Sequence, residues 1–186
     1  MSVVSASIQP PVRPPDQESH AVTGQALRKA LGRFVSGVTV VTTGHASDTG
    51  GIHGMTANAF TSVSLDPPLV LVSIATKAKM DARIAANGRY GVSVLRREQE
   101  PVSLHFAGGK PCPDQVRFVE RGGVPLLDGA LVHLACSVYD SHPAGDHTLH
   151  VGHVDELWSC HGDPLVFFTG DFRALEIVRE DAPWGF

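Results

Sequence analysis

Hydroxyl and ammonium groups gather where an apolar run, residues 69–74, gives way to a helical pattern that begins near Met80. They are Ser73, Thr76, Lys77 and Lys79. Such groups at a helix N-terminus suit an anionic phosphate, because the free backbone N–H groups and the helix dipole both favour negative charge there. A solvated helix start has the same composition, and Lys79 fits either interpretation. The pattern predicts a phosphate-binding corner.

A run of mostly small residues, Gly54 to Asn58, precedes this corner and leads into the strand alternation of residues 60–65. A strand with little side-chain bulk lets a flat ring approach the backbone. Small residues also occur where strands pack tightly, and for Ala57 and Ala59 taken alone that is the better interpretation. The strand and the corner together could hold an aromatic ring at one end and its phosphate tail at the other. That combination describes a flavin.

The sequence around these residues, GMTANAFTSVSLDPPLVLVSIA, resembles the signature of the short-chain flavin reductase family. Members of that family are the reductase components of two-component flavin-dependent monooxygenases. The resemblance continues upstream in LRKALGRFVSGVTVVTT, and downstream in Phe106-Ala107-Gly108, in Gly145-Asp146-His147 and in PLVFFTGDFRAL. It covers roughly residues 25 to 177 in the family's order, so it rests on more than one motif.

The resemblance implies which residues lie against the cofactor. For the isoalloxazine ring these are Thr56, Ala57, Asn58 and Ala59. Backbone N–H groups there would stabilise the negative charge that develops in the flavin on reduction. Phe106 and Ala107 match a segment near the flavin, although a buried helix end would look the same. Phe172 and Phe168 stand where many members carry Tyr, and they keep a stacking surface.

His147 stands out among ten histidines because it follows a Gly-Asp pair and begins a strand. The family's matching histidine lies beside the flavin, where an imidazole could polarise the nicotinamide carboxamide or balance flavin charge. We therefore expect His147 to be the catalytic residue, the other interpretation being a histidine that caps a turn. His147 and His153 with His161 or Cys160 would form a rival metal site. They lack a compact ligand spacing, and we predict no metal.

Hydride transfer between a nicotinamide and a flavin is carried out by the cofactors, so the protein needs only to bind and orient them. The chain has no GxSxG, HExxH, CxxC, Walker A or GxGxxG motif, so NADH or NADPH must bind outside a Rossmann crevice. The resemblance implies an NADH- or NADPH-dependent flavin reductase that reduces FMN or FAD and supplies the reduced flavin, by diffusion, to a partner monooxygenase. The alternative is a split-barrel flavoprotein that holds FMN for electron transfer or storage without turnover. The choice of nicotinamide, of flavin and of partner oxygenase stays open.

Length and composition indicate one ordinary globular domain of 186 residues, with 42% hydrophobic and 18% charged residues. The net charge of −4 creates no strong field for nucleic acid or an anionic membrane, and the longest apolar run is too short to span a bilayer. Three cysteines without a CxxC pair predict free thiols in a reducing compartment. No export signal begins the chain, so we expect a cytoplasmic protein.

Strands at short intervals and only a few helices predict a mainly β protein built as a closed antiparallel barrel. The expected strands are residues 38–43, 60–65, 69–74, 90–95, 124–127, 131–139, 148–157 and 165–168, and the expected helices are residues 27–35, 77–87 and 97–106. The resemblance implies the FMN-binding split β-barrel of antiparallel Greek-key type. It also implies a homodimer, because members of the family build the flavin site near a subunit interface.

Three parts of the chain are expected. Residues 1–22 are rich in proline, lack periodicity and predict a disordered or arm-like leader, with packing across a partner subunit as the alternative. Residues 23–178 form the flavin reductase-like split-barrel domain, and residues 179–186 form a C-terminal tail.

Overall fold

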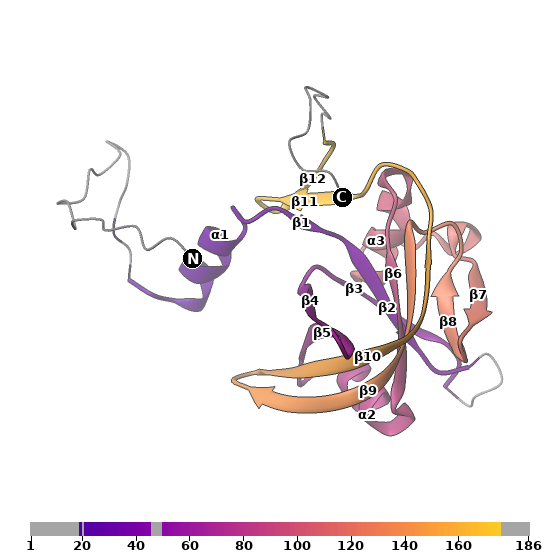
Figure 1. Cartoon of the computed structure of the whole chain (residues 1–186). Coiled ribbons are helices and arrows are strands. Elements are labelled where there is room, and N and C mark those ends of the chain that lie inside the picture. The colour runs from indigo at the N-terminus through magenta and orange to yellow at the C-terminus, as the bar shows by residue number, and fades with distance from the viewer. Residues whose placement is uncertain (1–18, 20, 46–49, 176–186) are drawn as a thin grey trace, which may run out of the picture.

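The computed structural model describes residues 19, 21–45 and 50–175, and Figure 1 shows most of them gathered into one β-rich body. Nearly all of the predicted leader, residues 1–22, and the whole predicted tail, residues 179–186, lie outside the described residues. The division of the chain into leader, domain and tail therefore stays a prediction.

Seven strands form one antiparallel sheet in the order β3-β2-β6-β9-β10-β5-β4. They are β2 (Thr39–Thr43), β3 (His53–Ala57), β4 (Phe60–Leu65), β5 (Pro68–Ala75), β6 (Arg89–Val94), β9 (Val132–Ala144) and β10 (His147–Ser159). The two edge strands, β3 and β4, are joined by Asn58 and Ala59 alone, so the sheet must curl until its edges meet. It closes into the barrel seen on the right of Figure 1, which confirms the predicted mainly β barrel.

Two smaller sheets and three α-helices complete the described chain. The sheets are β1 (Ser36–Gly37) with β11 (Val166–Phe168) and β12 (Asp171–Arg173), and β7 (Phe118–Arg121) with β8 (Val124–Leu127). The helices are α1 (Gly24–Leu31), α2 (Lys79–Asn87) and α3 (Glu100–Phe106), with 3-10 turns η1 (Arg97–Gln99) and η2 (Pro113–Gln115). The sequence alone does not predict β1, β7 and β12, because these short segments lack the apolar runs that mark β8 and β11.

The apolar face of α2 packs into the main core of the barrel. Met80 and Ile84 lie one helical turn apart, are fully buried, and pack with Val72 of β5 and Tyr90 of β6. Burying two side chains of this size contributes about 3 to 6 kcal/mol. Gly88 ends the helix in the left-handed conformation (φ 65°), where the sequence predicts the stop. Packing therefore fixes which face of α2 lies against the sheet, and Gly88 fixes where the helix ends.

The first helix is shorter than predicted and lies outside the barrel. α1 ends at Leu31, because the N–H groups of Arg33 and Phe34 bond to carbonyls three residues back rather than four and so leave the α-helical pattern. Phe34 and Val35 therefore lie beyond the helix. No residue of α1 is buried, and Phe34 is 81% exposed. Figure 1 shows α1 standing apart from the barrel and leading into it through β1.

The hairpin of β9 and β10 is longer than predicted. The expected strands, residues 131–139 and 148–157, leave eight residues between them, whereas the observed strands leave only Gly145 and Asp146. Gly145 has a φ of 63°, which glycine adopts at little cost. Pro143 is tolerated in β9 because β6 pairs with that strand only as far as Ser137, so one side of its far end carries no ladder.

All three cysteines lie in the described residues and carry free thiols, as predicted. Cys136 is fully buried in β9, and burial raises the pKa of its thiol to about 12. Of the helices in the part of the chain that the structure describes, none is long and apolar enough to cross a membrane.

Candidate active site

The barrel seam, residues 56–59 where β3 leads into β4, carries the residues predicted for the flavin ring. Ala57 is buried and its side chain joins the core, so only its backbone could face a ligand. The Thr56 hydroxyl donates to the carbonyl of Ser103 in α3 at 2.7 Å and is already engaged. Asn58 and Ala59 are exposed. The seam thus offers two exposed residues, Asn58 and Ala59, next to strand positions with little side-chain bulk, which suits a flat ring.

The predicted phosphate residues lie together around the start of α2, at what we call the corner. They are the half-buried Ser73 of β5 and the exposed Thr76, Lys77 and Lys79. Ala78 is the N-cap and has no polar side chain to bond the first turn, so the helix N-terminus keeps its attraction for an anion. Thr76 donates its N–H and its hydroxyl to the carbonyl of Asp146, at 3.0 and 3.3 Å. These two donors therefore hold the β9–β10 hairpin against the corner.

His147 begins β10 beside the corner. It pairs with Ala75 at the end of β5, and its Nδ1 lies 2.7 Å from Oδ1 of Asp146. The hydrogen bond and then the charge of His147 lower the pKa of the Asp146 carboxyl, and the charge of Lys77 adds to the effect. The imidazole is 42% exposed, so it remains accessible to a ligand. Its contact with the turn also fits the turn-capping interpretation, and its catalytic role stays a prediction.

Basic side chains connect the corner to the strand that leads into the seam. Burial lowers the pKa of His53 in β3, and the charges of Arg83 and then Lys79 lower it further. Arg83 donates to the carbonyls of Gly50 and Gly51 at 3.0 and 3.1 Å, which holds its charge beside β3. Positive charge therefore extends from the corner along α2 toward β3. This distribution suits a ligand with an anionic tail.

The predicted aromatic residues lie in two different places. Phe106 ends α3 and packs over Gly54 of β3, where an added Cβ would come within 2.5 Å of the ring. Ala107 is exposed just beyond it. Phe172 of β12 packs on Phe167, with ring centroids 5.6 Å apart. Phe106 and Phe172 border the same apolar cluster. Only Phe106, which belongs to α3, also packs against β3, the strand that leads into the seam.

The rival metal set does not assemble in the described residues. No group of three or more His, Cys, Asp or Glu side chains that could hold a metal ion occurs there. His153 instead pairs with Asp155 at 2.9 Å, and Cys160 accepts a hydrogen bond from Arg96 at 3.0 Å.

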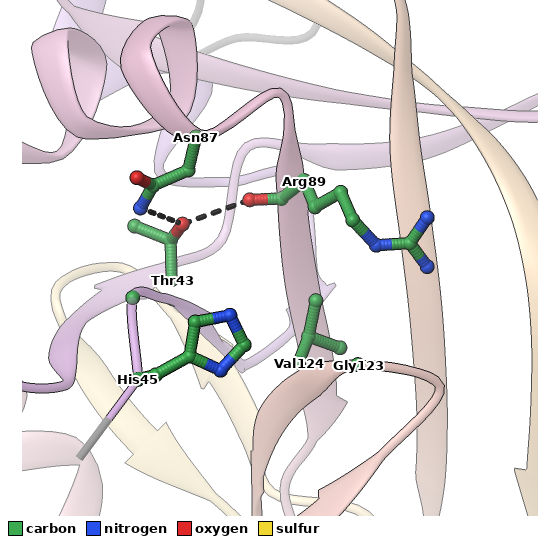
Figure 2. Close-up of a pocket in the computed structure, with 7 residues that line it drawn as sticks. Thr43, His45, Asn87, Arg89, Gly123 and Val124 are labelled. Carbon is green, nitrogen blue, oxygen red and sulfur yellow. Dashed lines mark hydrogen bonds between the residues drawn. The ribbon is translucent and has the colours of Figure 1, made fainter. Parts of the chain in front are cut away.

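The cavity in Figure 2 belongs to another part of the barrel. It encloses about 90 Å³ and is lined by Thr43, His45, Asn87, Arg89, Gly123 and Val124, among others. The Thr43 hydroxyl accepts from the Asn87 amide and donates to the Arg89 carbonyl, while the Arg89 guanidinium points away from them. Asn87 ends α2, so this cavity and the corner lie at opposite ends of that helix. A cavity of this volume is too small for a tricyclic ring system.

The chain matches the family model described as the flavin reductase like domain over residues 31–176. The chain belongs to this family. It is similar to an NADH-dependent flavin reductase from Rhodococcus sp, at 68% identity over 165 residues covering 89% of this chain and 94% of that protein. It is also similar to the reductase component of 4-hydroxyphenylacetate 3-monooxygenase from Thermus thermophilus, at 41% identity covering 81% of this chain and 96% of that protein. The predicted family resemblance is confirmed.

A solved structure supports the same assignment of fold. The NADH:FAD oxidoreductase of Streptomyces globisporus C-1027, in complex with NAD and FAD fragments, superposes with a TM-score of 0.77 at 36% identity. The match covers 87% of this chain and all of that one, so the whole barrel of this flavin reductase is shared.

Some residues near the site of this flavin reductase were not predicted. Arg83 could have been found, because it stands one helical turn after Lys79 and therefore on the same face of α2. His53 and Ser103 carry no such signal. Each reaches the site only through the fold, His53 by its place on β3 and Ser103 through the carbonyl that meets Thr56.

We expect the Asp146 carboxyl to titrate at higher pH in a His147→Ala variant than in the wild type. The imidazole is the main cause that lowers the pKa of Asp146, so its loss lets that pKa rise toward the ordinary value. Carbon-13 NMR of the carboxyl between about pH 2 and pH 6 measures the shift. Lys77→Ala serves as the control and should give a smaller rise, since Lys77 contributes less. Identical titration of wild type and His147→Ala would contradict the contact.

Proposed function

We propose that this flavin reductase transfers a hydride from NADH to FMN or FAD and releases the reduced flavin to a partner monooxygenase. The observation that carries the proposal is the corner, where the uncapped start of α2, the exposed Lys77 and Lys79, and the hairpin tip with His147 come together. The Rhodococcus relative is named for its NADH dependence, and the Thermus relative is named as the reductase component of a monooxygenase; both names support the proposal.

The residues present fit the phosphate and ring of a flavin. Lys77, Lys79 and the start of α2 would hold the phosphate by charge, and the backbone at Asn58 and Ala59 would lie along the ring. When bound, the flavin supplies the hydride-accepting chemistry. His147 would orient the nicotinamide carboxamide from beside the corner. The other residues that we propose at the site are Thr56, Ala57, Ser73, Thr76, Phe106, Ala107 and Phe172. Thr76 would act by holding the hairpin tip at the corner, since both of its donors bond to Asp146.

Of these contacts, Phe172 has the weakest structural support, because it lies on the small sheet of β1, β11 and β12.

The free thiols of all three cysteines support a cytoplasmic location, which we also propose.

Anaerobic mixing tests the activity directly. We expect NADH to bleach the visible absorbance of FMN or FAD in the presence of the protein, and NADPH to do so more slowly. We also expect the purified protein to retain little flavin, because the proposed phosphate contacts are lysines whose ion pairs are weak in water. A yellow protein that oxidises neither nicotinamide would contradict the proposal and favour the alternative of an FMN-binding flavoprotein without turnover.

His147→Ala should raise the apparent KM for NADH by about 5-fold, the equivalent of one lost hydrogen bond, and change the KM for flavin less. Steady-state kinetics with each substrate varied in turn measures the two effects. The control is His142→Ala, since His142 lies on the same hairpin and pairs with Asp140 at 3.2 Å. Unchanged dependence on NADH would remove the proposed role of His147.

We further propose that two copies of the chain associate through α1. Leu27 and Leu31 share one face of this helix and are 49% and 62% exposed, and the exposed Phe34 follows them. A continuous apolar face of this kind usually marks an interaction site. A second copy is the occupant that we propose, because the hairpin tip and the corner are also exposed in the single chain and a partner would help to cover them.

Replacing Leu31 and Phe34 together by Glu should convert a dimer into a monomer while the barrel stays folded, because no residue of α1 is buried. Light scattering coupled to gel filtration measures the mass, and circular dichroism checks the fold. Lys29→Glu on the opposite face of α1 is the matched control and should leave the dimer intact. A monomeric wild-type protein that still reduces flavin would contradict the proposed assembly.

A further inference from the structure

A histidine and an aspartate that are far apart in the sequence meet directly behind the corner. His150 of β10 is 1% exposed, and its Nε2 lies 2.8 Å from Oδ1 of Asp81 in the first turn of α2. The proposed binding and hydride transfer use neither residue. A histidine enclosed this completely needs partners for both ring nitrogens, so the contact requires a physical account.

Both nitrogens of the ring are satisfied from opposite sides. A carboxylate can only accept a hydrogen bond, so the Nε2–H group of His150 is the donor to Asp81. Nδ1 lies 2.9 Å from the hydroxyl of Ser141, which faces His150 across the β9–β10 hairpin. The ring therefore bridges the hairpin on one side and the helix on the other. Its orientation is fixed by two bonds rather than by packing alone.

The bridge lies close in sequence to both halves of the corner. Asp81 comes two residues after Lys79, and His150 comes three residues after His147 and pairs with Val72, the neighbour of Ser73. The N-cap of α2 forms no side-chain hydrogen bond, so the contact with His150 takes the place of a cap in locating the first turn. Moving that turn would move the cation of Lys79 relative to the hairpin tip.

We infer that His150 and Asp81 act as a positioning pair, which holds the start of α2 at the spacing from the hairpin that the flavin phosphate requires. This inference rests on the proposed function, since it assigns the pair to the phosphate corner. A purely structural pair would stabilise the fold without affecting how the phosphate is recognised. Riboflavin separates the two cases, because it carries the same ring as FMN and lacks the phosphate.

The test titrates each protein with FMN and with riboflavin and follows the quenching of flavin fluorescence. For the wild type we expect tighter binding of FMN. For His150→Leu we expect FMN affinity to fall by about 10-fold, the equivalent of one charge-assisted hydrogen bond lost between the displaced first turn and the phosphate, with riboflavin affinity changed less than about 2-fold. Asp81→Ala should behave in the same way and perturbs a less buried position, so it covers the case in which His150→Leu does not fold. His150→Gln, whose amide can donate to Asp81, should restore part of the FMN preference.

His153→Leu is the matched control, because His153 lies on the same strand and pairs with Asp155 rather than with α2. It should leave the FMN-to-riboflavin ratio unchanged. If folded Asp81→Ala and His150→Leu keep the wild-type ratio, the positioning role is overturned while the phosphate corner stands. If the wild type itself binds riboflavin as tightly as FMN, the corner is not a phosphate site and the positioning role falls with it. NADH oxidation measured separately then shows whether the reductase activity itself survives.

Discussion

The two-residue connection between β3 and β4 is the constraint on which the rest of the structure depends. These strands form opposite edges of a seven-stranded sheet, so a link of only Asn58 and Ala59 forces the sheet to curl until its edges meet. The hydrogen bond from the Ser73 N–H to the Ala59 carbonyl, at 3.0 Å, ties that link to β5. The strand that ends at the corner is thereby bonded to the seam. Barrel closure and the adjacency of the proposed ring and phosphate sites are consequences of the same short connection.

Helix α2 joins the packing of the barrel to the chemistry of its surface. Met80 and Ile84 bury one face in the core, while Lys79 and Arg83 carry charge on another face toward β3. The apolar residues determine where the first turn lies, and Asp81 adds a directional contact to β10 that apolar packing cannot supply. Apolar contacts are not directional, whereas the hydrogen bond from a buried imidazole to Asp81 also fixes the orientation of the first turn relative to β10.

Local features of this structure were predictable from the sequence, and those that depend on contacts between distant segments were not. The end of α2 at Gly88 follows from the chemistry of glycine, and the corner follows from the composition of residues 73–79. The prediction that the first helix ends at Val35 was wrong. The apolar spacing continues to that residue, whereas the helix ends at Leu31 with Gly32 as its C-cap. The contacts of Thr76 with Asp146 and of Asp81 with His150 span about 70 residues, and only the register of β5 with β10 brings them together. The family resemblance supplied the candidate residues of the seam, but not the basic side chains behind it.

The exposure of the corner bears on whether flavin is held or released. Ligands that are retained tightly lose most of their surface to an enclosed pocket, whereas here Asn58, Ala59, Lys77 and Lys79 are exposed in the single chain. Ion pairs between exposed groups contribute little in water, so in the proposed site the lysines would supply only part of the phosphate affinity, beside the free N–H groups at the start of α2. Most of the binding free energy must then come from burial of the ring, either against the seam or beneath a second copy of the chain. A site of this kind favours a flavin that arrives oxidised, is oriented for hydride transfer and leaves reduced.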